Sequence, residues 1–294
     1  MRYLIQEYQS FTDNYPDNPN AYEALLNQAL LYAYLLDEKD AAIDKLNELI
    51  ENPRVAPYIK AKAKLELGDI YMLKEEPWES TLLYSQVERS QRETPTGYEA
   101  KLRNAKLSYY KGEFALAQEH LDILKEATTR EIANDAMDLS IRIKENTTFD
   151  SAGTALSEFA AIELLLYQNK VDTALARMAT LKEGVVKGHA EKISNTSILD
   201  DLYWLEANVR LKRGEFDQAY ALLQKIMEEY GDDILADDAF FMQGEIMELY
   251  KKEKELAMEI YREFLNKFPG SVYAAEARKR YRQMRGDFDN IPNQ

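Results

Sequence analysis

The chain has no cysteine and only two histidines among its 294 residues. Without thiols, disulfides, thiolate metal sites and cysteine nucleophiles are excluded. His120 and His189 lie far apart in the sequence, and neither belongs to a His-x-x-x-His or His-Glu motif. The sequence also lacks a glycine-rich phosphate loop and the Gly-x-Ser-x-Gly motif of hydrolases. It therefore predicts a protein that is not an enzyme and has no cofactor and no bound metal.

Long apolar runs and excess positive charge are also missing. No uninterrupted apolar stretch approaches the roughly 20 residues that cross a bilayer, so we expect no membrane-spanning segment. Lysine and arginine number 37 against 52 aspartates and glutamates, which gives a formal net charge of −15. A field of this sign repels nucleic acid. We expect a protein or peptide partner instead.

The densest acidic run, residues 228–238, could in principle bind a cation. It lacks the alternating ligand spacing of a calcium loop. Asp232 and Asp233 come just before an expected helix, where the helix dipole favours negative charge. We therefore interpret the run as helix capping.

Glycine and proline are sparse, with 11 and 8 residues, and they separate long segments rich in alanine, leucine, glutamate and lysine. This composition is typical of helices joined by short turns. Two segments far apart share one pattern, an apolar helix face that ends in proline. They are Leu4, Tyr8, Phe11, Tyr15 and Pro16, and Ala257, Tyr261, Phe264, Phe268 and Pro269. The chain is thus expected to consist of repeated helical hairpins and to begin in the middle of a repeat.

The hairpins can be aligned on one small or apolar position in each first helix. The longest interval, between Ala105 and Ile162, predicts an additional helix over about 129–145. Glycine inside a helix usually marks close approach of a neighbouring helix, so Gly68 predicts a tight contact. The aligned positions are Ala29, Gly68, Ala105, Ile162, Ala207 and Gly244.

Several short motifs resemble tetratricopeptide repeats over nearly the whole chain. They are Leu67-Gly68-x-x-Tyr71, Ala257-x-x-x-Tyr261 with Pro269, and the turns Gly112-Glu113-Phe114 and Gly214-Glu215-Phe216. The resemblance implies an all-α fold, a right-handed α-α superhelix of about six hairpins with an irregular helix near the middle. The expected organisation is an array over 1–127, a junction over 128–152, a second array over 153–286 and a tail over 287–294.

In this family the first helices of the hairpins line a concave groove that holds a peptide or a partner helix. The resemblance therefore implies a non-enzymatic protein-binding scaffold. Repeat packing also uses tyrosine, as at Tyr71 and Tyr261, so packing remains the alternative for each aromatic residue. By repeat register the groove would be lined by Tyr34, Leu65, Asp69, Lys106, Tyr109, Tyr110, Trp204, Asn208, Phe241 and Glu245.

The family's clamp for acidic chain ends needs lysine where this chain has Leu26, Leu65 and Leu102, so an acidic tail is not the expected ligand. Residues 268–277 resemble the repeat ends of bacterial envelope proteins, and the long acidic units resemble large proteins of the Bacteroidetes group. This resemblance favours a periplasmic or envelope location and leaves the cytoplasm open. The alternative function is a structural subunit of a larger envelope assembly complex, joined through the convex face or the terminal helices.

Overall fold

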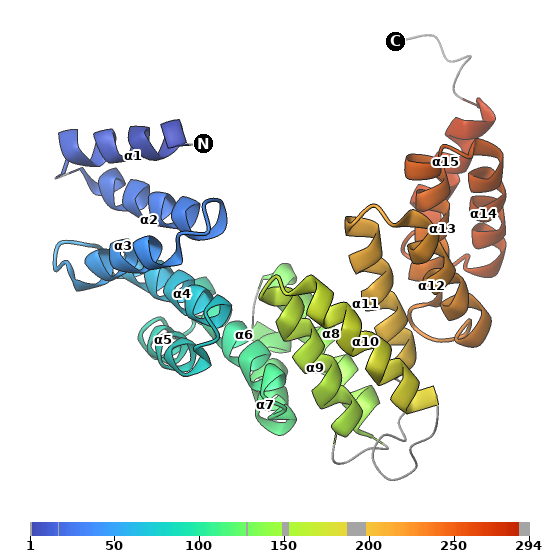
Figure 1. Ribbon diagram of the computed structural model, residues 1–294, viewed down its shortest axis with the longest axis horizontal. Coiled ribbons are helices and arrows are strands. Elements are labelled where there is room, and N and C mark those ends of the chain that lie inside the picture. The colour runs from blue at the N-terminus through green and yellow to red at the C-terminus, as the bar shows by residue number, and fades with distance from the viewer. Residues whose placement is uncertain (1, 17, 128, 149–152, 187–197, 288–294) are drawn as a thin grey trace. The chain divides into compact units, whose positions relative to one another are not determined.

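The computed structural model describes residues 2–16, 18–127, 129–148, 153–186 and 198–287 (Figure 1). Within these ranges every regular element is a helix and no strand occurs, which confirms the predicted all-helical solenoid. None of the helices in these ranges combines the length and the apolar character needed to cross a membrane. The chain divides into two compact units, unit 1 (Met1–Lys170) and unit 2 (Val171–Gln294).

Unit 1 is a succession of helices in which each packs against the next. Proline occupies the first turn of α2, α4, α5 and α6, where its missing N–H costs no hydrogen bond. The helices are α1 (Arg2–Asn14), α2 (Pro19–Tyr34), α3 (Lys39–Glu51), α4 (Pro57–Leu73), α5 (Pro77–Ser90), α6 (Pro95–Tyr110), α7 (Phe114–Ala127), α8 (Arg130–Thr147) and α9 (Thr154–Tyr167).

Unit 2 continues the pattern of paired helices, with a π-helical segment, η1, directly after α13. The helices are α10 (Val171–Val186), α11 (Ile198–Lys212), α12 (Phe216–Glu229), α13 (Ala236–Glu245), η1 (Ile246–Lys251), α14 (Lys254–Lys267) and α15 (Ala274–Arg285). Residues 187–197, which join α10 to α11, and most of the expected tail lie outside the described residues.

The additional helix predicted near 129–145 is present as α8. Regular pairing changes after it, because α9 packs mainly against α6, two helices before α8. These contacts place both α8 and α9 in unit 1. The division into repeat arrays over 1–127 and 153–286 stays a prediction about how the hairpins are ordered.

The aligned positions form the centre of each hairpin. Ala29, Ala105, Ile162 and Ala207 have no exposed surface, and both glycines of the alignment are also buried. The contact predicted at Gly68 is confirmed: a Cβ atom there would lie 2.4 Å from Cε1 of Tyr84. The missing side chain of the first helix therefore makes room for an aromatic ring of the second.

The same contact recurs in unit 2, where a Cβ on Gly244 would lie 2.6 Å from Cε1 of Tyr261. The tyrosine follows its glycine by 16 positions in unit 1 (84 minus 68) and by 17 in unit 2 (261 minus 244). The π-helical segment η1 lies between the glycine and the tyrosine of unit 2. A π-helical turn takes up one extra residue, so the ring reaches the same place despite the longer connection.

We expect Gly68→Ala to lower the free energy of unfolding of unit 1 by about 1–2 kcal/mol. Overpacking against a pinned ring costs about 1–3 kcal/mol, more than alanine's helix propensity of about 1 kcal/mol returns. Each unit holds one of the two tryptophans, Trp78 and Trp204, so urea unfolding followed by fluorescence in a Trp204→Phe background reports unit 1 alone.

Gly270→Ala is the matched control, because nothing lies within 4 Å of its added Cβ. Its effect should stay within about 0.5 kcal/mol, measured through Trp204 in a Trp78→Phe background. Equal effects of the two substitutions would contradict the close-approach role of Gly68.

Candidate functional site

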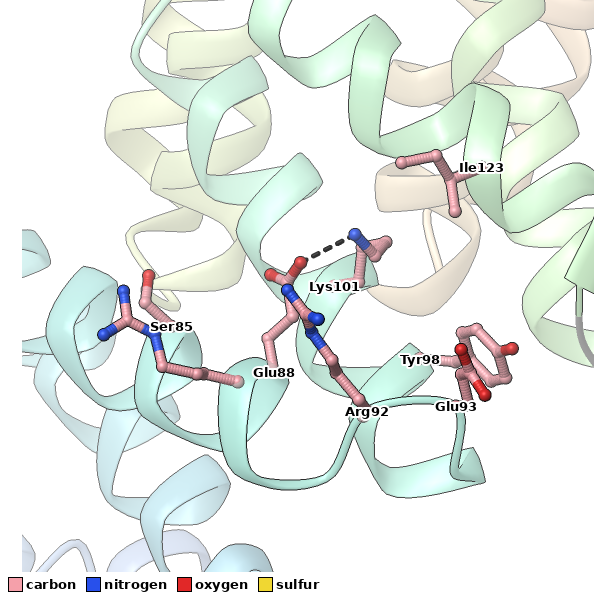
Figure 2. Close-up of a pocket in the computed structure, with 9 residues that line it drawn as sticks. Ser85, Glu88, Arg92, Glu93, Tyr98, Lys101 and Ile123 are labelled. Carbon is pink, nitrogen blue, oxygen red and sulfur yellow. Dashed lines mark ion pairs between the residues drawn. The ribbon is translucent and has the colours of Figure 1, made fainter.

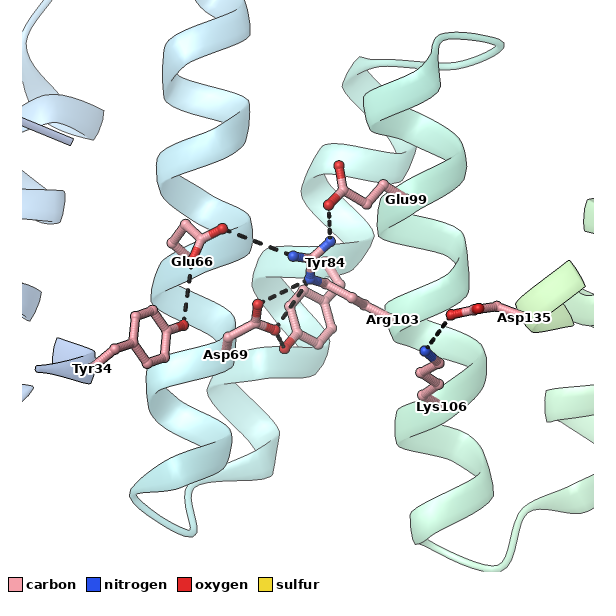
Figure 3. Close-up of polar contacts among 8 residues, drawn as sticks. All are labelled: Tyr34, Glu66, Asp69, Tyr84, Glu99, Arg103, Lys106 and Asp135. Atoms are coloured by element: carbon pink, nitrogen blue, oxygen red, sulfur yellow. Dashed lines mark hydrogen bonds and ion pairs between the residues drawn. The ribbon is translucent and has the colours of Figure 1, made fainter. Parts of the chain in front are cut away.

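A chain of polar contacts crosses the first helices of unit 1, on the face that the repeat register predicts to be the groove (Figure 3). We call this set of side chains the polar ladder. It links α2 to α4, α4 to α6 and α6 to α8, so successive hairpins are joined by polar as well as apolar contacts. Its members are Tyr34, Glu66, Asp69, Tyr84, Glu99, Arg103, Lys106 and Asp135.

Arg103 is the centre of the ladder. Its Nε lies 3.2 and 3.1 Å from the two carboxylate oxygens of Asp69, and its Nη1 lies 2.6 Å from Oε1 of Glu99. A third carboxylate, that of Glu66, lies 3.9 Å from Nη2. One guanidinium therefore faces three carboxylates from two helices.

Two tyrosines complete the hydrogen bonding of these acids. The hydroxyl of Tyr84 donates to Oδ1 of Asp69 at 2.6 Å. The hydroxyl of Tyr34 donates to Oε2 of Glu66 at 3.3 Å. Tyr84 is the same ring that covers Gly68, so the apolar contact at the centre of the hairpin and the polar ladder share one side chain.

Burial sets the protonation behaviour of the ladder. Burial raises the pKa of Asp69, and Arg103 opposes this rise. Burial and the neighbouring charge of Asp69 also raise the pKa of Glu66. For Arg103, burial disfavours the charged form, but the surrounding carboxylates outweigh it and raise the pKa. With three acids and one arginine, this part of the ladder has an excess of negative charge.

Helix α9 lies on the same face and contributes its own polar contacts. Glu163 accepts a hydrogen bond from the hydroxyl of Tyr109 at 2.6 Å and lies 3.2 Å from Nη1 of Arg142. At the end of α9, the side chain of Gln168 donates to the backbone oxygen of Met72 at 3.1 Å. Lys170 then pairs with Glu75 at 2.5 Å. The α9 segment thus reaches from α6 and α8 to the end of α4.

Apolar contacts also hold α9 against the preceding helices. Leu164 packs against the buried cluster that includes Leu65 and Met72 of α4. The rings of Tyr110 and Tyr167 lie 6.4 Å apart. Leu65, which the repeat register predicts to line the groove, is only 2% exposed, and Met72 is 4% exposed.

The predicted groove residues of unit 1 lie in different surroundings. Tyr34 is 49% exposed, and Lys106 pairs with Asp135 at 2.9 Å while remaining partly open to solvent. Tyr110 is half-buried, and Tyr109 is only 1% exposed. Tyr34 and Lys106 are therefore the more accessible pair, and Tyr109 anchors α9.

In unit 2, Trp204 and Asn208 are half-buried neighbours on α11, and the side chain of Asn208 donates to the backbone oxygen of Trp204 at 2.8 Å. Phe241 is 5% exposed and stacks on Tyr273, with ring centroids 4.7 Å apart. Glu245 lies 2.9 Å from Nη2 of Arg280. The structure thus brings Phe241 and Glu245 together at the contact between α13 and α15.

The last helix, α15, is rich in basic residues, and Arg280 is the one that holds it in place. Its side chain is only 19% exposed and pairs with Glu245, Glu248 and Glu276. It also donates to the hydroxyl of Tyr261 at 3.3 Å, so it holds α15 against the preceding hairpin. Arg278 and Lys279 on the same helix are exposed.

Sequence reasoning missed Arg103 and Arg280 as corresponding residues. Arg103 follows Gly68 by 35 positions (103 minus 68), and Arg280 follows Gly244 by 36 (280 minus 244). Each comes from the next first helix and pairs with an acid that also accepts from the tyrosine covering the glycine. Aligning the basic residues at this offset would have revealed the pair.

His120 is the one histidine that the described residues include. His120 is half-buried on α7, and burial lowers its pKa. His189 lies outside the described residues. Among the residues that the structure places, no group of three or more histidines or acids has a geometry that could hold a metal ion.

We expect Arg103→Met to destabilise unit 1 by about 2–3 kcal/mol at pH 7, because the variant leaves buried carboxylates without a cation. The folded-state pKa values of Asp69 and Glu66 lie above their unfolded values, so these groups favour folding when protonated. The deficit relative to the parent chain should therefore shrink as the pH falls. Urea unfolding of the variant and the parent chain at pH 7 and at about pH 4.5, followed by the fluorescence of Trp78, measures this difference in stability. A deficit that does not change with pH would be the contrary result.

Comparison with known protein families gives two matches to the tetratricopeptide repeat model, over residues 23–53 and 238–271. The first covers the α2–α3 hairpin of unit 1, and the second covers α13, η1 and α14 of unit 2. A search of curated proteins finds no match. Both matches fall on hairpins of the all-helical array, and the repeated glycine–tyrosine contact occurs in each unit. The chain therefore contains tetratricopeptide repeats, one matched in each unit.

Proposed function

We propose that this chain is a non-enzymatic scaffold that binds a peptide or partner helix on the groove face of unit 1. Tetratricopeptide repeats generally mediate protein–protein interaction. The observation that carries the proposal is α9, a helix seated on this face through both apolar and polar contacts. Because this face already binds one helix of its own chain, its exposed part offers the same kinds of apolar and polar contact to a helix of a partner protein.

The open part of the face lies around Tyr34, Glu66 and Lys106. Tyrosine offers a large apolar ring with a polar tip at low entropy cost, which suits peptide recognition. The excess of carboxylates around Arg103 favours a segment that carries a basic or amide side chain. Because repeat stacking preorganises the ladder, a partner would bind with little ordering of the scaffold.

In unit 2 we propose Trp204 and Asn208 as the corresponding contact residues. Both are half-buried on α11, a first helix in the repeat register. Phe241 and Glu245 would act indirectly, since their contacts with Tyr273 and Arg280 hold α15 in place.

The second candidate function is a structural subunit of a larger assembly, joined through other faces. Exposed apolar side chains favour it: Tyr3 and Leu4 on α1 are 71% and 45% exposed, and Trp78 on α5 is 78% exposed. Large exposed aromatics often serve as anchors in protein interfaces. This candidate would use the outer faces of α1 and α5 and leave the polar ladder uncovered.

Site-specific photocrosslinking separates the two functions. A photoreactive amino acid placed singly at Tyr34, Trp204, Tyr3 or Trp78 would be activated in a lysate and an envelope fraction of the source organism. Groove binding predicts covalent capture of one partner from Tyr34 or Trp204. Capture from Tyr3 or Trp78 alone would contradict groove binding and support the structural role.

A substitution pair then tests the contact itself. Tyr34→Ala in the chain without a crosslinker should weaken binding of the partner identified by crosslinking about tenfold or more, the loss of one good interface anchor. Tyr58→Ala is the matched control, because Tyr58 is also 49% exposed and also donates to a carboxylate, that of Glu23, outside the predicted groove register. Equal losses in the two variants would contradict a specific role for Tyr34.

A further inference from the structure

A cavity of about 530 Å³ lies between α5, α6 and α7, and its lining differs from the polar ladder (Figure 2). We infer that it binds a ligand through an oxyanion, either a phosphate or a carboxylate group. Its walls come from the end of α5, the turn that follows and the start of α6, with Ile123 from α7. Its volume lies within the range typical of small-ligand sites, about 300–1,000 Å³.

One of the two acids in the cavity lining, Glu88, is already neutralised. Glu88 lies 2.6 Å from Nζ of Lys101 and accepts from the side chain of Asn104 at 2.8 Å. Figure 2 shows the ion pair between Glu88 and Lys101 among the lining residues. Glu88 therefore adds little repulsion toward an incoming anion.

Two arginines of the lining have no such partner. Arg89 and Arg92 are exposed, and neither makes an ion pair or a hydrogen bond to any described residue. Glu93 is the one other acid in the lining. Two guanidiniums beside one open cavity, in a chain with a net charge of −15, form a local positive site. Guanidinium groups match phosphate and carboxylate through paired hydrogen bonds.

The helix dipole accounts for the position of only one of these two arginines. Arg89 lies in the last turn of α5, where the terminal carbonyl groups favour a cation. Arg92 lies beyond the end of the helix, in the turn to α6, so this stabilisation does not extend to it. Its position on the cavity rim, with an aromatic and an aliphatic wall from Tyr98 and Ile123, suits an organic ligand that carries an anionic group.

The turn that holds Arg92 is fixed by its neighbours. The side chain of Thr94 donates to the backbone oxygen of Gln91 at 2.7 Å and accepts from the backbone N–H of Gly97 at 3.1 Å. Gly97 permits this close approach, because a Cβ there would lie 2.0 Å from the oxygen of Gln91. The backbone at the rim is therefore preorganised, which reduces the cost of binding.

The test uses the full chain and two defined probes, inorganic pyrophosphate and tricarballylate, titrated by calorimetry at constant ionic strength. We expect one site, with binding weakened about tenfold or more in Arg89→Ala/Arg92→Ala. The lysine variant Arg89→Lys/Arg92→Lys should lose part of this affinity, because lysine keeps the charge but not the paired hydrogen bonds. Binding of pyrophosphate alone would assign a phosphate ligand, and binding of tricarballylate alone a carboxylate ligand.

Arg130→Ala/Arg278→Ala is the control, since it removes the same charge from exposed positions outside the cavity. Loss of binding confined to the cavity variants supports the inference. Equal losses in both double variants, or no binding of either probe up to roughly 10 mM, overturn it. Circular dichroism and urea midpoints must match those of the parent chain for each variant, and a variant that fails this check is replaced by the single substitution Arg92→Gln.

Discussion

The arrangement of both units depends on an aromatic ring that fills the space of a missing side chain. Tyr84 covers Gly68 in unit 1, and Tyr261 covers Gly244 in unit 2. In each case the tyrosine hydroxyl donates to an acid, Asp69 of α4 or Glu248 of η1, and an arginine from the following first helix pairs with the same acid. One contact therefore fixes the two helices of a hairpin and also their neighbour. This linkage explains how an acidic chain without cysteine holds two of its hairpins to the helices that follow them.

The same linkage places the groups proposed to bind partners. Because Arg103 joins α4 to α6, the acids around it lie in a row on the groove face, with Tyr34 at one end. Helix α9 covers the neighbouring part of that face. It is held there by Glu163, which accepts a hydrogen bond from Tyr109, and by the apolar contact of Leu164. The arginine-lined cavity lies between the end of α5 and the start of α6, so the two sites share these two helices but none of their residues.

Much of the fold could be predicted because helical repeats produce a regular spacing of apolar and small residues in the sequence. The buried glycines, the extra helix α8 and the hairpin turns follow from periodicity and from the conformational needs of glycine. The seating of α9 could not be predicted, because it depends on contacts between residues such as Tyr109 and Glu163, which are 54 positions apart. Side-chain exposure could not be predicted either: the repeat register gives the face of a helix, but Tyr109 and Phe241, both predicted to line the groove, are only 1% and 5% exposed.

A double-mutant cycle between Tyr261 and Arg280 tests the shared glycine–tyrosine–acid–arginine contact most directly. Tyr261→Phe, Arg280→Met and the double variant would be unfolded in urea and followed through Trp204 in a Trp78→Phe background. Because both side chains converge on Glu248, the account predicts a coupling energy of about 1 kcal/mol, and each single variant should destabilise unit 2. Losses that add within about 0.3 kcal/mol would show that the two residues act independently and would contradict the account.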